Sequence, residues 1–390
     1  MDDMAQDASG RQVWIDIARG IGISLVVLAH MSIPPGLTQY ICAFHMPLFF
    51  FLSGLLYKRR PFAEVLARRA RTLLAPYLLF SLMALAVDDV VLVNFYQGMA
   101  HYGRQLLGIV YAAADGPYPL AVFPLWFLIS LFAAQVIFSC VLSISRQHPV
   151  RALALVSILA AIGFINSRTT RLAVPWSVTT SLIGLLFLAV GDRARQWVAG
   201  WTSLTSGASL TAVVLLAGAV GIAANLNDPV IMAHDSYGSI PLFLFGALCG
   251  IAMTLLLGML LERLYHLTAP LPGAAPVAAG GRRVARASIG GMTTCLTYLG
   301  RNALIILPMH VLAPALAEHW LAWILPLLNP IFAGAMHKLL AGLILLASIE
   351  LLRRCPLIVP RKSIRAVAVV SQAPQTAGLP SSASANVTGR

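Results

Sequence analysis

The chain has 390 residues, of which 59% are hydrophobic and only 11% are charged, and its mean hydropathy is +0.82. A water-soluble fold could not bury so much apolar surface, so the composition excludes a soluble globular protein and predicts an all-α polytopic membrane bundle. The formal net charge of +13 would suggest nucleic acid in a soluble protein, but in a membrane protein it reflects topology, and we expect no nucleic-acid partner.

Ten apolar stretches are long enough to cross the hydrocarbon core of a bilayer as helices. They are continuous and lack the alternating pattern of membrane β-strands. We therefore expect about ten transmembrane helices embedded in the lipid bilayer, at residues 13–31, 38–57, 72–93, 122–144, 150–166, 172–191, 202–224, 240–261, 296–316 and 331–352.

The basic residues are distributed unevenly between the loops. The loop at residues 58–71 carries six of them, and the other loops on the same side are also basic. Cytoplasmic loops are enriched in Lys and Arg, so this side is predicted to be cytoplasmic and both termini lie there. The loops on the opposite side contain only Arg104, Arg168 and Arg171.

The expected domain organisation is one membrane domain between two cytoplasmic ends. Residues 1–12 form an N-terminal segment that does not resemble a cleavable signal peptide, residues 13–352 form the transmembrane domain, and residues 353–390 form a largely disordered tail. By composition, Ala269–Gly281 is a flexible linker. The scattered cysteines indicate neither a disulfide framework nor a metal cluster, and we expect no metal.

The first predicted span contains three ionisable side chains, Asp16, Arg19 and His30. Eleven residues separate Arg19 from His30, which returns to within about 20° of the same helix face about 16 Å farther along the axis. Ionisable groups in hydrocarbon are costly and usually functional. The alternative is that Asp16 and Arg19 only neutralise each other near the membrane surface and His30 caps the helix.

The two longest outer loops are rich in side chains that can bind a polar ligand, although interfacial aromatic residues that anchor helix ends would produce a similar pattern. These loops are Asn94–Ala121, with Tyr96, His101, Tyr102, Asp115 and Tyr118, and Asn225–Ser239, with His234, Asp235 and Tyr237.

Several motifs occur together in one order along residues 11–352. They are RGIGISLVVLAH, AFHMPLFFFLSGLLYKRR, LARRARTLLAPY, PLWFL and LGRNALIILPMH. In this combination the chain resembles the membrane acyltransferase-3 family, and most closely its sugar O-acetyltransferases of bacterial inner membranes, the fucose 4-O-acetylase-like branch. The resemblance implies an acyltransferase that uses acetyl-coenzyme A or another acyl-coenzyme A and modifies a carbohydrate or glycolipid hydroxyl.

The family motifs fall on particular residues of this chain. The basic residue and histidine separated by ten positions correspond to Arg19 and His30, and the Arg-x-x-Arg motif corresponds to Arg68 and Arg71. Guanidinium groups at a cytoplasmic helix mouth suit the phosphates of coenzyme A, so we expect Arg68, Arg71 and Arg19 to contact the coenzyme. The other basic residues of the loop, Arg59, Arg60 and Arg69, are explained by topology alone.

We hypothesise that His30 is the general base, with Arg19 steadying the oxyanion or the coenzyme and Asp16 orienting Arg19. A covalent acyl-histidine relay is the other route. A transporter or flippase also keeps charges inside a helical bundle, and it remains the alternative function. Further candidates for contacts with substrate are His45, Ser53 in the FFLSG motif, Trp126 and His310. Pro47 is expected to free a backbone carbonyl inside the span near His45. The alternative for Ser53 is a packing role, in which it allows close helix contact beside Gly54.

Overall fold

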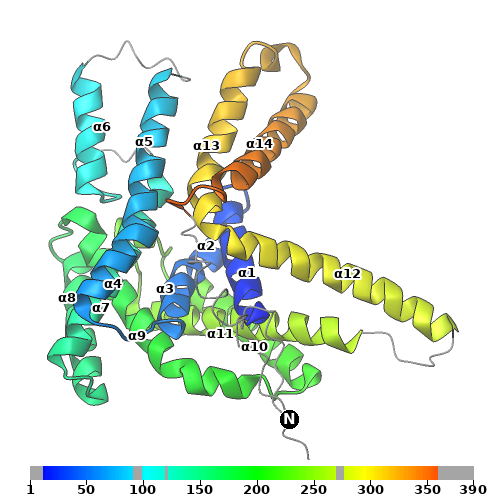
Figure 1. Ribbon diagram of the computed structural model, residues 1–390, viewed down its shortest axis with the longest axis horizontal. Helices are drawn as coiled ribbons and strands as arrows, with labels where there is room; N and C mark the ends of the chain where they lie inside the picture. The colour runs from blue at the N-terminus through cyan, green and yellow to red at the C-terminus, as the bar shows by residue number, and fades with distance from the viewer. Residues whose placement is uncertain (1–11, 91–98, 119–121, 269–275, 359–390) are drawn as a thin grey trace, which may run out of the picture.

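The computed structural model describes residues 12–90, 99–118, 122–268 and 276–358 (Figure 1). The described part is helical and contains no β-strand, only one isolated bridge between Ile231 and Ser236. The predictions for the N-terminal segment before residue 12, for Tyr96 and for the tail beyond residue 358 fall outside the described residues.

The helices follow one another along the chain with short connections. In order they are α1 (Val13–Ala29), α2 (Pro35–Cys42), α3 (His45–Leu55), α4 (Phe62–Arg69), a π-helical turn (Ala70–Leu74), α5 (Ala75–Val90), α6 (Met99–Tyr111), α7 (Trp126–Ile144), α8 (Pro149–Arg168), α9 (Val178–Trp201), α10 (Ser206–Leu226), α11 (Ile240–Leu267), α12 (Pro276–Arg301), α13 (Ala303–Leu321) and α14 (Pro330–Leu352).

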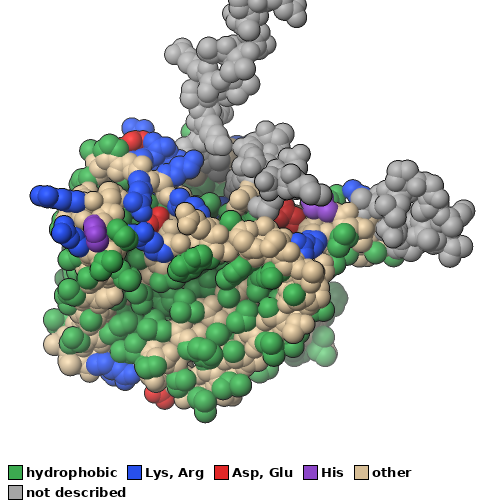
Figure 2. Space-filling view, turned by 90° about the horizontal axis from the view of Figure 1, so that it is seen from below, with side chains coloured by type: hydrophobic (Ala, Val, Ile, Leu, Met, Phe, Trp, Pro, Cys, Tyr) green, Lys and Arg blue, Asp and Glu red, His purple; other side chains and the backbone are tan. Residues whose placement is uncertain are grey.

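The expected polytopic membrane bundle is confirmed. Among the described residues, nine helical stretches are long and apolar enough to cross a membrane. The first predicted span is α1, a helix of 17 residues that is not among these nine. On the face shown in Figure 2, hydrophobic side chains cover the middle, while Lys and Arg gather along two opposite edges, more densely at one. This is the surface expected of a protein surrounded by lipid.

The predicted span at residues 38–57 is not one helix. It is interrupted at Ala43–Phe44, so that α2 and α3 are separate and α3 begins at His45. Pro47 therefore lies in the first turn of α3, where its missing N–H would have no helical acceptor in any case. The expectation that this proline frees a carbonyl group inside a continuous span was wrong.

The predicted span at 296–316 and the predicted linker Ala269–Gly281 also need correction. Helix α12 begins at Pro276, inside that linker, and continues to Arg301. At this end the Asn302 side chain donates a hydrogen bond to the Tyr298 carbonyl oxygen at 2.8 Å, and the Asn302 backbone N–H donates to the same oxygen at 3.2 Å. A new helix, α13, begins directly afterwards.

One predicted outer loop also contains a helix. Helix α6 lies within Asn94–Ala121 and packs beside α5, and the two project together from one side of the molecule (Figure 1). Helices α13 and α14 form a second projecting hairpin.

Helix α1 is central to the bundle and packs against α3, α11, α12 and α13. Glycines allow two of the closest crossings. A Cβ atom on Gly20 would overlap the Leu296 carbonyl group, and one on Gly54 would overlap the Leu188 carbonyl group. The second crossing brings α3 against α9, which supports the packing interpretation of the segment around Ser53.

Candidate active site

Three histidines from three different helices come together in the bundle. His30 is the residue that follows the last turn of α1, His45 is the first residue of α3, and His310 lies in α13. The rings of His30 and His310 are 4.8 Å apart between centroids and meet edge to face at 70°. His45 is also close enough to His30 for their rings to interact electrostatically. The imidazole of His30 thus contacts α13 through His310.

The three rings share one hydrogen-bonding pattern. In each, Nδ1 lies at hydrogen-bond distance from the carbonyl oxygen four residues earlier in the chain: 2.8 Å for His30, 2.9 Å for His45 and 3.2 Å for His310. A carbonyl oxygen only accepts hydrogen bonds, so Nδ1 carries the proton in each ring. In the neutral rings, Nε2 is therefore an acceptor.

The surroundings of the three histidines differ. His30 is exposed, whereas His45 and His310 are buried, with 6% and 8% of their surface accessible. Among the described residues, Nε2 of His310 is buried without a hydrogen-bond partner. Pro314 follows four residues after His310 and cannot donate to its carbonyl oxygen, so one backbone hydrogen bond of α13 is missing at this position. The result is a polar spot within the apolar residues 303–317 of α13.

A second constellation lies nearer the start of α1. The Asp16 carboxylate is fully buried, and its guanidinium contacts within the described residues include Arg19 Nη1 at 3.5 Å from Oδ1 and Arg301 Nε at 3.1 Å from Oδ2. A Cβ atom on Gly300 would overlap the Asp16 carbonyl group, so the close approach of α12 requires glycine at that position. Asp16 therefore forms ion pairs with both Arg19 and Arg301, and a role for it in orienting Arg19 stays a prediction.

Arg301 was not among the predicted site residues. It lies within the predicted span at 296–316, and nothing in the sequence pattern shows that α12 ends beside α1. The available signal was that an arginine inside an apolar stretch needs a partner. The sequence does not show which carboxylate is that partner, because Asp16 is 285 residues away from Arg301 along the chain.

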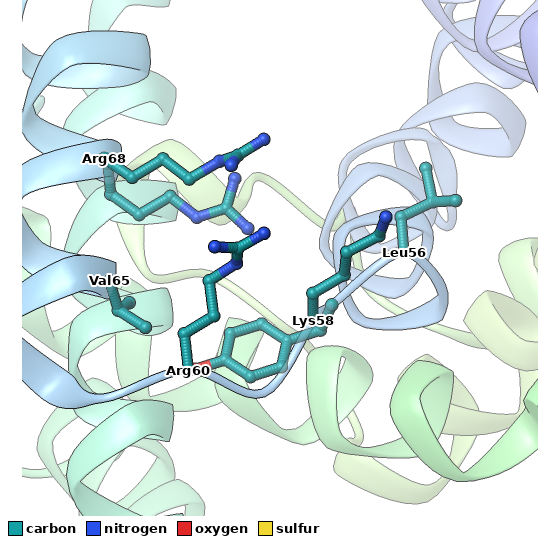
Figure 3. A pocket seen from close by; sticks show the side chains of 7 residues that line it. Leu56, Lys58, Arg60, Val65 and Arg68 are labelled. Carbon is teal, nitrogen blue, oxygen red and sulfur yellow. The ribbon is translucent and has the colours of Figure 1, made fainter. Parts of the chain in front are cut away.

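A basic pocket of about 120 Å³ lies where α3 ends and α4 begins (Figure 3). Figure 3 shows Lys58, Arg60 and Arg68 pointing into the same space. Glu64 forms an ion pair with Arg60, which leaves the pocket with more cations than anions. Its lining residues are Leu56, Tyr57, Lys58, Arg60, Val65, Arg68 and Arg69.

The pocket includes only part of the predicted coenzyme-binding set. Arg68 lines it, but Arg71 does not; Arg71 lies in the π-helical turn that follows α4 and is exposed. The wider π turn changes the angle between successive residues, so a spacing of three residues does not place both side chains on one helix face here. Lys58, Arg60 and Arg69 also line the pocket. From the sequence, Arg60 and Arg69 were explained only by the cytoplasmic position of their loop.

An ion-pair network holds the segment of chain that forms the pocket floor. Arg195 of α9 donates to the backbone carbonyls of Leu55 and Tyr57 at 3.0 and 2.7 Å. Asp192 contacts both Arg195 and Arg59. Burial raises the pKa of Tyr57, so its phenol stays neutral beside the cations. The pocket is thus anchored to α9.

The remaining predicted site residues are Ser53 and Trp126. Ser53 is half-buried on α3, next to the tight crossing at Gly54. Trp126 is buried at the first residue of α7 and packs edge to face against Phe127. Neither has a hydrogen bond or ring contact with His30 or His310 among the described residues, so their role in substrate binding stays a prediction.

The two polar outer segments meet in space. His234 contacts the carboxylate of Asp115 and packs against the ring of Phe123 at 5.4 Å between centroids. The neighbouring Asp235 accepts hydrogen bonds from Thr180 at 2.7 Å and from Tyr237 at 2.9 Å. Burial raises the pKa of Asp235. These contacts join the connection between α10 and α11 to α9 and to the segment before α7.

No group of three or more His, Cys, Asp or Glu side chains with the geometry of a metal site occurs among residues 12–90, 99–118, 122–268 and 276–358. Imidazole groups accept and release protons near neutral pH, so the histidine cluster is suited to acid–base chemistry.

Comparison with known protein families matches residues 12–347 to the acyltransferase-3 family, described as an acyltransferase domain. The match includes the histidine cluster, the Asp16 ion pairs and the basic pocket. Searches of curated proteins and of solved structures found no match. The chain, a multi-pass membrane protein with apolar helices along most of its length, is an acyltransferase that belongs to the acyltransferase-3 family.

Proposed function

We propose that the protein is an O-acyltransferase of the bacterial inner membrane. It transfers an acyl group, most simply acetyl, from acyl-coenzyme A to a hydroxyl group of a carbohydrate or glycolipid, and His30 is the general base. The observation that carries the proposal is the His30 ring, which turns toward α13 with Nδ1 fixed on the Val26 carbonyl and Nε2 able to accept a proton.

The chemistry requires a base because a sugar hydroxyl is a weak nucleophile. An imidazole with an ordinary pKa near 6.5 can remove the hydroxyl proton at neutral pH, an effect worth about 10² to 10⁴ in rate. In the proposed reaction the proton moves to His30 Nε2 while the oxygen attacks the thioester carbonyl carbon. The tetrahedral intermediate then expels the coenzyme A sulfur, which takes the proton back from His30, and the products are the ester and the free thiol.

The donor has its own complementary region. Coenzyme A carries its phosphates at the end remote from the thioester, and guanidinium groups bind phosphates through paired, charge-assisted hydrogen bonds. Lys58, Arg60, Arg68 and Arg69 line one pocket, and we propose that this pocket binds those phosphates. Arg71 is the less favoured member of the predicted pair because it does not line the pocket.

The distance along α1 limits what Arg19 can do. Arg19 and His30 are eleven residues apart on a continuous helix, which corresponds to about 16 Å. An oxyanion formed beside His30 is therefore out of reach of Arg19. We propose that Arg19, held by Asp16, acts on the coenzyme, and that a different donor near His30 stabilises the oxyanion.

The decisive experiment measures the transfer of labelled acetyl from acetyl-coenzyme A in membranes that contain equal amounts of folded protein. The acceptor is the membrane glycan and glycolipid fraction of a strain that lacks the gene. We expect wild-type protein to label the glycan, His30→Ala to lose at least a hundredfold of the rate, and His148→Ala, which changes an exposed histidine at the start of α8, to remain active.

Two outcomes would reject the proposed reaction. Wild-type turnover by His30→Ala would remove His30 from the chemistry, and movement of a glycan across proteoliposomes without consumption of donor would indicate a transporter or flippase. Retention of label on the protein when the acceptor is omitted would favour the acyl-histidine relay over direct transfer.

A further inference from the structure

Nε2 of His310 is a buried acceptor that no described residue satisfies. Its ring is held in place on both sides: Nδ1 lies 3.2 Å from the Ile306 carbonyl oxygen, and the ring edge packs against His30. Buried polar atoms in folded proteins nearly always have a hydrogen-bond partner. An orphaned acceptor of this kind therefore points to a group that arrives with the substrate.

The neighbouring imidazoles cannot supply the missing donor in their neutral forms. His30 uses its Nδ1 proton on the Val26 carbonyl, and His45 uses its own on the Ile41 carbonyl. Their Nε2 atoms are acceptors, as is that of His310. His30 and His310 are in ring contact, so one molecule that brings O–H or N–H groups to this place can satisfy both acceptors.

We infer that His310 binds the acyl acceptor, with Nε2 accepting a hydrogen bond from a hydroxyl group adjacent to the one that His30 deprotonates. This inference rests on the proposed function. The two ring centroids are only 4.8 Å apart, so donors that reach both rings must lie close together, as hydroxyls on neighbouring carbons of a sugar do. The acceptor is accordingly a carbohydrate whose reactive hydroxyl has a hydroxyl neighbour.

The acyl donor is a less suitable partner at this position. The thioester carbonyl that must approach His30 has only acceptor atoms. The pantetheine arm of coenzyme A does carry amide N–H groups and a hydroxyl, so the shared chemistry is a hydrogen-bond donor. The two sources are distinguished by which Michaelis constant responds when Nε2 is removed.

Two amide substitutions separate the nitrogens of His310. In His310→Asn the amide nitrogen takes the approximate position of Nδ1 and can still donate to Ile306, but nothing replaces Nε2. In His310→Gln the longer side chain places its amide oxygen near the position of Nε2, where it can still accept. His319→Asn and His319→Gln serve as matched controls, because His319 lies on the same helix and is only partly buried.

The assay uses labelled acetyl-coenzyme A and the glycan fraction described above, with each substrate varied in turn. We expect His310→Asn to lower kcat/KM for the glycan about tenfold to a hundredfold, the range for loss of a hydrogen bond in a buried site, with an unchanged KM for acetyl-coenzyme A. His310→Gln should retain most of the activity, and both His319 variants should match wild type.

The opposite order, with His310→Gln inactive and His310→Asn active, would mean that the ring serves only to bond Ile306 and would overturn the inference. A change confined to the KM for acetyl-coenzyme A would assign the contact to pantetheine and would also overturn it. Failure of the proposed function is separate, because it would appear as a lack of transfer by the wild-type protein.

A second measurement applies if His310→Asn does not fold. In ¹⁵N-histidine-labelled wild-type protein in nanodiscs, with the signal assigned by His310→Gln, we expect an unprotonated Nε2 whose resonance shifts on addition of the glycan fraction and not of acetyl-coenzyme A. A protonated Nε2, or a response to acetyl-coenzyme A alone, would refute the inference.

Discussion

Replacement of Asp16 by asparagine tests whether the buried ion-pair group holds α1 against α12. The amide side chain of the Asp16→Asn variant would keep one acceptor oxygen but would direct an N–H group at one of the two guanidiniums that Asp16 now contacts, Arg19 at 3.5 Å and Arg301 at 3.1 Å. Loss of a hydrogen bond to a charged group costs about 1.5–3 kcal/mol. The arginines are partly exposed, so their mutual repulsion is screened and adds little. We expect a loss of about 2–3 kcal/mol in the free energy of unfolding.

The measurement is denaturant unfolding in mixed micelles, carried out as a double-mutant cycle with Arg301→Gln. Because the two side chains touch, the double variant should lose at least about 1 kcal/mol less than the sum of the single variants. Asp228→Asn, at an exposed carboxylate, is the control and should match wild type. Additive effects, or an Asp16→Asn protein as stable as wild type, would refute the conclusion that this contact stabilises the crossing.

Three further predictions test other parts of the molecule. Arg68→Gln should raise the KM for acetyl-coenzyme A by about tenfold to a hundredfold, because a charge-assisted hydrogen bond to phosphate is lost, whereas Arg151→Gln should leave this KM unchanged. Equal KM values for the two variants in radiolabel assays would contradict the assignment of the pocket. Gly54→Ala should lower the free energy of unfolding by about 1–3 kcal/mol because its Cβ meets a backbone carbonyl, while Gly218→Ala, at an open position, should not; equal thermal stability would argue against the tight crossing. Asp235→Asn should leave stability at pH 7 unchanged or higher. The raised pKa of the Asp235 carboxyl means that the folded protein binds its proton more tightly than the unfolded chain, so the charged form is unfavourable in the folded state. The stability advantage of the amide should therefore disappear as the pH falls through that pKa. Unfolding measurements across a pH series test this.

The number and placement of the apolar helices could be predicted because hydrophobic length alone determines whether a segment can span a bilayer. The interruptions could not. The break at Ala43–Phe44 occurs inside a predominantly apolar run, and the break at Asn302 lies at a single polar residue of another such run. Hydropathy averaged over a window does not respond to either feature. It also missed the extension of α12 back to Pro276, where small residues gave the composition of a linker.

The candidate site was predictable to the extent that single helices determine it. His30, His45 and His310 were all selected as polar groups in apolar stretches, but their convergence depends on packing between α1, α3 and α13. The pairing of Asp16 with Arg301 depends in the same way on the crossing of α1 and α12. The basic loop was recognised by its charge, yet a π-helical turn decided which arginines face the pocket.

The histidines also explain how an apolar bundle can retain titratable rings. Each ring returns Nδ1 to a carbonyl oxygen of its own chain, so half of its hydrogen-bonding requirement is met locally, whatever surrounds it. Because the same arrangement occurs three times, the remaining nitrogens are all acceptors when the rings are neutral. A ligand that satisfies more than one of them must therefore bring more than one donor. A polyol has such donors on adjacent carbons and a thioester carbonyl has none, which is why the cluster fits the acceptor substrate better than the acyl group it receives.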